Sequence, residues 1–115
     1  MHRIPSTDGV VLAVHDLGGA GPRLLLTHAT GFHGRVFAPL ARALGGRFRC
    51  VAPDLRGHGV TTTPEGLGYE WSGFGDDVRA VIDGLGDGPW FGAGHSLGGA
   101  ALLMAEERRP GTFAG

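Results

Sequence analysis

The sequence predicts an α/β fold in which a mostly parallel sheet is flanked by helices. Segments typical of strands and of helices alternate from Pro22 onward, and such alternation favours parallel strands joined by right-handed helical crossovers. Pro22–Ala29 (PRLLLTHA) is a short, continuous apolar run, as expected for a strand buried on both faces. With 115 residues, 42% of them hydrophobic, the chain suits one small domain over residues 1–115.

Strands are expected in four places. Gly9–Gly19 is rich in β-branched residues and is closed by glycines, and Pro22–Ala29 follows it. Arg47–Asp54 is expected to be the third strand and Gly88–His95 (GPWFGAGH) the fourth. The last residues, 112–115, have the character of the start of a further strand. Residues 55–68 are rich in glycine, proline and threonine, and we expect them to form a loop.

Helices are expected in three places. Arg35–Leu44 carries apolar residues on one helical face, namely Val36, Phe37, Leu40 and Leu44. Phe74–Gly86 repeats apolar residues every three to four positions, namely Phe74, Val78, Val81, Ile82 and Leu85. Its first turn is expected to hold Asp76 and Asp77, which together with Asp83 are interpreted as a solvated face. Leu97–Arg109 is the third helix, ended by Pro110.

Composition excludes several classes of function. The formal net charge is −1, so the chain does not resemble a nucleic-acid binder. It contains no lysine, which rules out a P-loop. Cys50 is the single cysteine, so an internal disulfide is impossible, and His28 with His33 lacks a third metal ligand. With no leader-like start and no apolar run near the ~20 residues of a membrane span, the expected compartment is the cytoplasm.

Ser96 lies in the motif G-x-S-x-G, between Gly94 and Gly98. Glycine supplies 23 of the 115 residues, so the motif is meaningful only through its surroundings. A predicted strand precedes it and a predicted helix follows, which is the context in which such a serine is exposed on a sharp, strained turn. The glycines would remove side chains that collide there, and the helix N-terminus would offer free N–H groups to an oxyanion.

Two other interpretations of this turn were weighed. Ser96 could be an ordinary helix N-cap, which is the commonest role of a serine between a strand and a helix. The turn could also bind a dinucleotide through G-x-G-x-x-G, but Leu97 occupies the position of the third glycine. The second alternative therefore fails, and the first stays open at this point.

Three segments in order carry a family resemblance: LLLTHATGFHG (Leu24–Gly34), DLRGHG (Asp54–Gly59) and GHSLGG (Gly94–Gly99). Together they resemble the N-terminal half of the α/β-hydrolase superfamily, the serine esterases and lipases, and the resemblance covers about Val10 to Arg109. It implies a partial α/β-hydrolase fold that is truncated after the helix following the nucleophile elbow.

The resemblance also implies roles for individual residues. Ser96 would be the nucleophile, and the backbone N–H groups of Leu97 and Thr30 would form the oxyanion hole. Gly94 and Gly98 would be the glycines of the elbow. Counting from the first loop to the next aromatic residue favours Thr30 over Phe32 as the second donor.

Other positions of the resemblance are expected to be structural. His28 resembles the histidine that orders the first loop, and His95 would support the elbow. Family members usually have glycine where this chain has Ala29, whose Cβ is expected to restrict the turn. In DLRGHG, Asp54 and Arg56 are expected to tie the loop together. His58 would be structural or border the mouth of the site.

The acid and base of a catalytic triad are expected to be missing from this chain. The family order is Ser, then Asp or Glu, then His, but only Glu106 and Glu107 follow Ser96, and no histidine does. A serine without a positioned base is a weak nucleophile. The 115-residue chain is therefore expected to be nearly inactive alone, and the strand at Pro89–His95 to form an unprotected sheet edge.

The leading hypothesis is a serine hydrolase that cleaves an ester or related acyl bond of a small molecule through an acyl-enzyme, with no metal and no cofactor. Related acyltransferases, perhydrolases and C–C hydrolases use the same serine and stay open. A non-catalytic fragment or binding module of the same fold is the alternative from another class. Dehalogenases and epoxide hydrolases are disfavoured because they carry Asp where Ser96 stands. The oligomeric state is not indicated.

Overall fold

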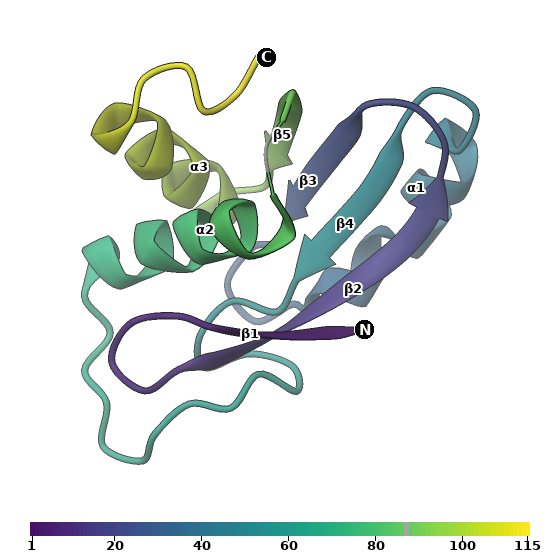
Figure 1. Cartoon of the computed structure of the whole chain (residues 1–115). Coiled ribbons are helices and arrows are strands. Elements are labelled where there is room, and N and C mark those ends of the chain that lie inside the picture. The colour runs from purple at the N-terminus through teal and green to yellow at the C-terminus, as the bar shows by residue number, and fades with distance from the viewer. Residues whose placement is uncertain (87) are drawn as a thin grey trace.

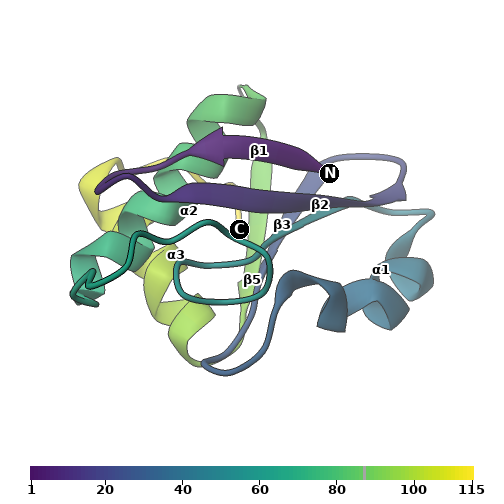
Figure 2. The same cartoon turned by 90° about the horizontal axis from the view of Figure 1, so that it is seen from below.

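A five-stranded mixed sheet forms the centre of the molecule, with helices on both faces (Figures 1 and 2). The computed structural model describes residues 1–86 and 88–115. The strands are β1 (His2–Pro5), β2 (Val11–Gly19), β3 (Arg23–Thr27), β4 (Arg49–Pro53) and β5 (Trp90–Gly94), in the spatial order β1-β2-β4-β3-β5. The helices are α1 (Ala38–Leu44), α2 (Trp71–Leu85) and α3 (Leu97–Arg108), with a 3₁₀ turn at Gly34–Phe37 before α1.

The predicted α/β fold is confirmed. β3 pairs in parallel with both β4 and β5, whereas β1 pairs with β2 and β2 with β4 in the antiparallel sense. The helices α2 and α3 lie side by side on one face, and α1 lies on the other (Figure 2). The carboxyl ends of β3, β4 and β5 therefore lead into the three segments that the sequence singled out, which places all three at one edge of the sheet.

The central strand β3 is buried on both faces, as its apolar run predicts. Leu25 packs into the core between the sheet and the pair α2 and α3. Leu24 and Leu26 point the other way, into a smaller core under α1 with Cys50 and Ala52 of β4. Burial on alternate sides explains why the strand carries only leucine between Arg23 and Thr27.

The first helix differs from its prediction. The segment begins as a 3₁₀ turn and becomes α-helical only at Ala38. Phe37 and Leu44 pack against the smaller core, but Val36 and Leu40 are 45% and 44% exposed. The face that packs against this core is made by Phe37, Ala41 and Leu44, at the spacing of four and three residues that one helical face requires, so Val36 and Leu40 lie beside it.

The second helix begins three residues earlier than predicted, at Trp71, with Glu70 at the N-cap. Asp76 and Asp77 consequently lie inside the helix, and the prediction that they occupy its first turn is wrong. The interpretation of Asp77 as solvated is also wrong, since this side chain is fully buried. The apolar residues behave as expected, with Val78 and Val81 completely buried in the larger core.

The two edges of the sheet complete the description. β1 was not predicted from the sequence, and it forms one edge by pairing with β2. At the other edge, Phe113 bridges Trp90 in parallel, and the N–H of Gly92 donates to the Gly115 carbonyl at 3.0 Å. The expectation of a strand beginning at residues 112–115 thus has a structural counterpart.

Leu55–Gly68 is a loop as predicted, attached to β2 by a bridge from Thr62 to Val11. None of the described helices could cross a membrane.

Candidate active site

Ser96 stands on a two-residue turn between β5, which ends at Gly94, and α3, which begins at Leu97. Its backbone has φ 53° and ψ −113°, in a region that residues with a side chain rarely adopt. The strand–turn–helix setting and the unusual backbone expected from G-x-S-x-G are therefore both present. Ser96 and the neighbouring His95 are exposed.

The two flanking glycines are required by close backbone packing. A Cβ on Gly94 would lie 2.5 Å from the amide nitrogen of Gly99, and a Cβ on Gly98 would overlap the carbonyl of Thr27. The hydroxyl of Thr27 also donates to the Gly98 carbonyl at 2.9 Å. The start of α3 thus lies directly against the end of β3, and this contact fixes the position of Ser96 relative to the loop that follows β3.

The side chain of Ser96 does not cap α3. Although Ser96 occupies the N-cap position, its hydroxyl makes no capping hydrogen bond, and no other partner is found for it within residues 1–86 and 88–115. Its carbonyl accepts the N–H of Ala100 at 3.1 Å, as the first acceptor of the helix. The hydroxyl is therefore free for chemistry, and no base is bonded to it.

In the described part of the chain, neither the backbone N–H of Leu97 nor that of Thr30 has an acceptor. The N–H of Phe32, the alternative donor, is already bonded to the Ala29 carbonyl at 3.1 Å. Ala29 is buried and is not among the residues with positive φ, so the Cβ that was expected to restrict the turn is accommodated. Leu97 and Thr30 line the same pocket.

That pocket is an open cleft of about 470 Å³ with a mainly apolar wall. It is lined by Thr30, Gly57, His58, Tyr69, Trp71, Phe74 and Leu97. The Tyr69 ring stacks on Phe74 with centroids 6.3 Å apart, and Trp71 meets Phe74 edge-on at 6.4 Å. Because the lining includes no carboxylate, arginine or lysine, the cleft suits an uncharged group.

Asp54 ties the loops around the cleft together. Its carboxylate accepts the N–H of Gly34 at 2.7 Å and that of Val60 at 2.9 Å, and it lies 3.1 Å from His15 Nε2. Burial opposes the charge, but these hydrogen bonds outweigh it and lower the pKa of Asp54. The expected role of Asp54 is present in the geometry, whereas the buried partner His15 carried no recognisable signal in the sequence.

Arg56 and Asp77 form a completely buried ion pair below the same loop. Arg56 Nη2 donates to Asp77 Oδ1 at 2.9 Å, and the Arg56 backbone N–H donates to Asp77 Oδ2 at 2.9 Å. Further bonds run from the guanidinium to Asp8 and Thr7. Burial disfavours the cation, but the carboxylates of Asp77 and Asp8 raise the pKa of Arg56. The loop, α2 and the turn after β1 are thereby joined.

The two histidines expected to support the site differ in their surroundings. His28 is completely buried, and both of its ring nitrogens are engaged by backbone groups. Desolvation by burial lowers the pKa of His28, so the ring is neutral. His95 is exposed, and its backbone N–H donates to the Thr27 carbonyl at 3.0 Å. A supporting role of its side chain stays a prediction.

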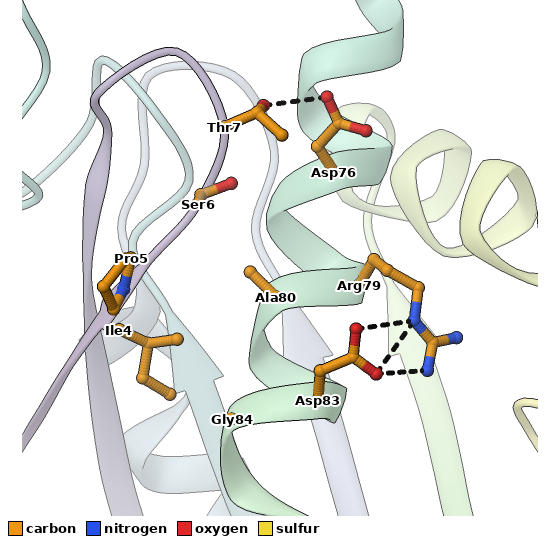
Figure 3. Close-up of a pocket in the computed structure, with 9 residues that line it drawn as sticks. All are labelled: Ile4, Pro5, Ser6, Thr7, Asp76, Arg79, Ala80, Asp83 and Gly84. Carbon is orange, nitrogen blue, oxygen red and sulfur yellow. Dashed lines mark hydrogen bonds and ion pairs between the residues drawn. The ribbon is translucent and has the colours of Figure 1, made fainter.

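A second pocket, of about 520 Å³, lies away from these residues, between β1 and α2 (Figure 3). Figure 3 shows the Thr7 hydroxyl bonded to Asp76 at its rim and the ion pair of Arg79 with Asp83. None of the site residues expected from the sequence lines it. In the described part of the chain, no group of three or more His, Cys, Asp or Glu residues is placed to hold a metal ion.

Comparisons with known proteins find hydrolases that are similar to this chain. Residues 24–114 match the model of the alpha/beta hydrolase family. The chain is 38% identical over 92 residues to 2-(acetamidomethylene)succinate hydrolase of Mesorhizobium japonicum, covering 80% of this chain and 33% of that protein. It is 36% identical over 100 residues to lipase LipV of Mycobacterium tuberculosis, covering 86% and 37%. Haloalkane dehalogenase 2 of the same organism is 34% identical over 91 residues, covering 78% and 32%.

Two solved structures are similar to this chain over most of its length. The structure of E-2-(acetamidomethylene)succinate hydrolase superposes with a TM-score of 0.85 at 34% identity, over 98% of this chain and 41% of that one. An alpha/beta hydrolase from Sphaerobacter thermophilus gives 0.79 at 31% identity, over 92% and 40%. The chain thus spans about a third of the length of the curated relatives and about two fifths of the solved chains.

Proposed function

Because the chain belongs to the alpha/beta hydrolase family, we propose that it carries the nucleophile and oxyanion hole of a serine hydrolase acting on an ester or related acyl bond. The observation that supports this most is the backbone of Ser96, which holds a free, exposed hydroxyl on a strand-to-helix turn. A backbone held in such a region persists only where its surroundings over-determine it, and it is found preferentially at functional sites.

In the proposed reaction, Ser96 Oγ attacks the acyl carbonyl carbon and loses its proton to a base. The N–H groups of Leu97 and Thr30 donate to the oxyanion that develops on the carbonyl oxygen. The alcohol or other leaving group departs with a proton, and an acyl-enzyme forms at Ser96. Water then attacks the acyl-enzyme and releases the carboxylic acid.

The base of this reaction is proposed to lie outside these 115 residues. No histidine of residues 1–86 and 88–115 is bonded to the Ser96 hydroxyl, and both ring nitrogens of His28 are engaged elsewhere. The short span of the chain relative to its relatives is consistent with this. Expressed alone, the chain is therefore expected to hydrolyse p-nitrophenyl acetate no faster than its Ser96→Ala variant.

The substrate is proposed to be a small molecule with an uncharged group against Tyr69 and Trp71. The resemblance to dehalogenases does not extend to their chemistry, because Ser96 stands where those enzymes carry Asp. Acyltransfer, perhydrolysis and C–C hydrolysis would use the same serine and stay open. The missing base also favours a second candidate, a non-catalytic module that binds ligands through this cleft.

Labelling with a fluorophosphonate separates the two candidates. In a longer natural polypeptide that contains these residues, the probe is expected to attach to Ser96, as located by mass spectrometry, and Ser96→Ala is expected to abolish labelling. Ser72→Ala is the matched control, since Ser72 is also exposed and should not matter. Labelling that survives Ser96→Ala would overturn the assignment of Ser96 as the nucleophile. Robust Ser96-dependent turnover by the 115-residue chain alone would overturn the proposal that the base lies outside these residues.

A further inference from the structure

Two histidines connect the loop that carries Thr30 to the loop that follows β4, in opposite directions. His28 lies on the first loop, and its Nε2 accepts the N–H of Leu55 at 3.0 Å. His58 lies on the second loop, and its Nε2 accepts the N–H of Gly31 at 3.0 Å. The two rings lie side by side with their centroids 4.9 Å apart.

The other ring nitrogens determine which tautomer is present. His28 Nδ1 is 2.8 Å from the carbonyl oxygen of Ala29, and His58 Nδ1 is 2.9 Å from that of Arg56. A carbonyl oxygen only accepts hydrogen bonds, so each Nδ1 must carry a proton. Each Nε2 accepts a backbone N–H and must have a free lone pair. Both rings are therefore neutral in this arrangement.

The bond from Gly31 to His58 holds a turn in which the N–H of Thr30 stays without an acceptor in the described residues. Residues 29–32 form a β-turn closed by the Phe32 N–H on the Ala29 carbonyl. Gly31 has φ 86°, as the third position of a type II turn requires. The N–H of Phe32 is used within the turn and that of Gly31 by His58, so Thr30 is left with the free donor.

We propose that His58 is a positioning residue for the oxyanion hole: by holding the N–H of Gly31, it fixes the turn that presents the N–H of Thr30 to the cleft. This inference rests on the proposed function in so far as Thr30 is taken as the oxyanion donor. His58 itself lines the cleft, together with Thr30. A proton on Nε2 would place two donors against each other and release the turn.

The charged and titratable groups around His58 are few. The ring of His28 faces it, with Asp54 and His33 interacting with His28 in turn. Tyr69 shares the cleft with His58. The guanidinium of Arg56 is bound to Asp77 and Asp8. Burial lowers the pKa of the facing His28 ring.

Nuclear magnetic resonance of the ¹⁵N-labelled 115-residue chain tests this directly. The His58 ring is expected as the Nδ1–H tautomer, and the Gly31 and Thr30 amide signals are expected to shift once that ring takes up a proton on Nε2. In His58→Leu, exchange of the Gly31 amide should be roughly 3- to 10-fold faster, as for loss of one hydrogen bond. His58→Gln keeps an acceptor that does not titrate, so it should restore protection and remove the pH dependence.

The amide of Val81, in the core, controls for global unfolding in each variant. If His58→Leu accelerates exchange at every amide, the test rests on His58→Gln. In that variant, Gly31 and Thr30 amide signals that still shift with pH overturn the proposal. An Nε2–H tautomer, or an unchanged Gly31 amide in His58→Leu, also overturns it. Ser96→Ala should leave every one of these signals unchanged, so the inference can hold even where labelling of Ser96 refutes the proposed nucleophile.

Discussion

Among single residues, Gly98 lies with its Cα against the Thr27 carbonyl, where a Cβ would overlap backbone atoms of β3. Gly98→Ala is therefore expected to push α3 away from the sheet and to lower the free energy of unfolding by about 1–3 kcal/mol or more. Chemical denaturation followed by circular dichroism measures the change. The variant should also move Ser96 relative to Thr30.

Gly99 is the matched control for this substitution, one position further along α3. A Cβ there would lie 3.5 Å from the carbonyl oxygen of Gly94, which is ordinary contact. Gly99→Ala should be neutral or stabilise the protein by roughly 0.5–1 kcal/mol, as alanine does in a helix. Equal destabilisation by the two substitutions would contradict the packing argument and indicate that any side chain in this turn is disruptive.

The residues around Ser96 could be predicted from the sequence because they obey local rules. Gly94, Ser96 and Gly98 form a contiguous motif whose geometry depends on neighbours in the chain. His15 and Asp77 could not be predicted, because their partners Asp54 and Arg56 are distant in sequence. Nothing in the residue types on β2 or α2 marks one charged or polar side chain as buried and the next as exposed.

At the scale of elements, the ion pair of Asp77 with Arg56 attaches α2 to the loop after β4. Both side chains are buried, so Asp77→Ala would leave the buried guanidinium with only the more exposed Asp8 as a carboxylate partner, and is expected to destabilise the fold by about 3–5 kcal/mol. Thermal and denaturant unfolding measure this. The loop carrying His58 should lose order first, since the Arg56 backbone N–H is also bonded to Asp77.

Asp83→Ala provides the comparison within the same helix. Asp83 pairs with Arg79 one turn away and is 54% exposed, so the loss is expected to be below about 1 kcal/mol. A similar effect of the two substitutions would mean that burial does not control the strength of these pairs. A much larger effect at Asp77 supports its assignment as the connection between α2 and the candidate site.

The sequence predicted where helices lie better than where they begin. α2 starts at Trp71 rather than Phe74 because Gly73 and Gly75 are helical despite their low propensity. A Cβ on Gly73 would meet the Arg56 guanidinium, and one on Gly75 would come within 3.0 Å of Met104. Tertiary packing, which a local pattern does not contain, thus requires glycine inside the first turns of α2.

At the scale of the whole molecule, stability is expected to fall as the pH decreases, in two stages. Burial lowers the pKa of His28, so below about 6.5 the unfolded chain takes up a proton that the folded chain refuses. The hydrogen bonds of Asp54 lower its pKa despite burial, so its contribution is complete above about 3.9 and disappears as the pH falls further. Each group changes the unfolding free energy by at most about 1.4 kcal/mol per pH unit.

Denaturant unfolding between pH 8 and about 3 measures these two stages. In His28→Gln, whose side chain does not titrate, the slope between about pH 6.5 and 5 should decrease while the acidic stage remains. An unchanged slope in that variant would show that His28 is protonated equally in the folded and unfolded chains. The comparison uses slopes, so a lower overall stability of the variant does not affect it.

The parallel part of the sheet was predictable, and its edges were not. Alternation of strand and helix from Pro22 onward specifies β3, β4 and β5, because a helical crossover returns each strand in the same direction. β1 is four residues long with one buried residue, Ile4, and so has no periodicity to recognise. Its place follows from pairing with β2, a contact that only the folded chain creates.

The positive φ of Ser96 also lowers the free energy of unfolding of the protein. A residue with a side chain at such φ and ψ values costs about 1–3 kcal/mol, and glycine would remove most of that penalty without disturbing a single helix or strand. Selection for stability alone would therefore favour glycine at position 96. Under the proposed function, Ser96 supplies the reacting hydroxyl, so the protein would give up stability at the residue where activity needs that hydroxyl.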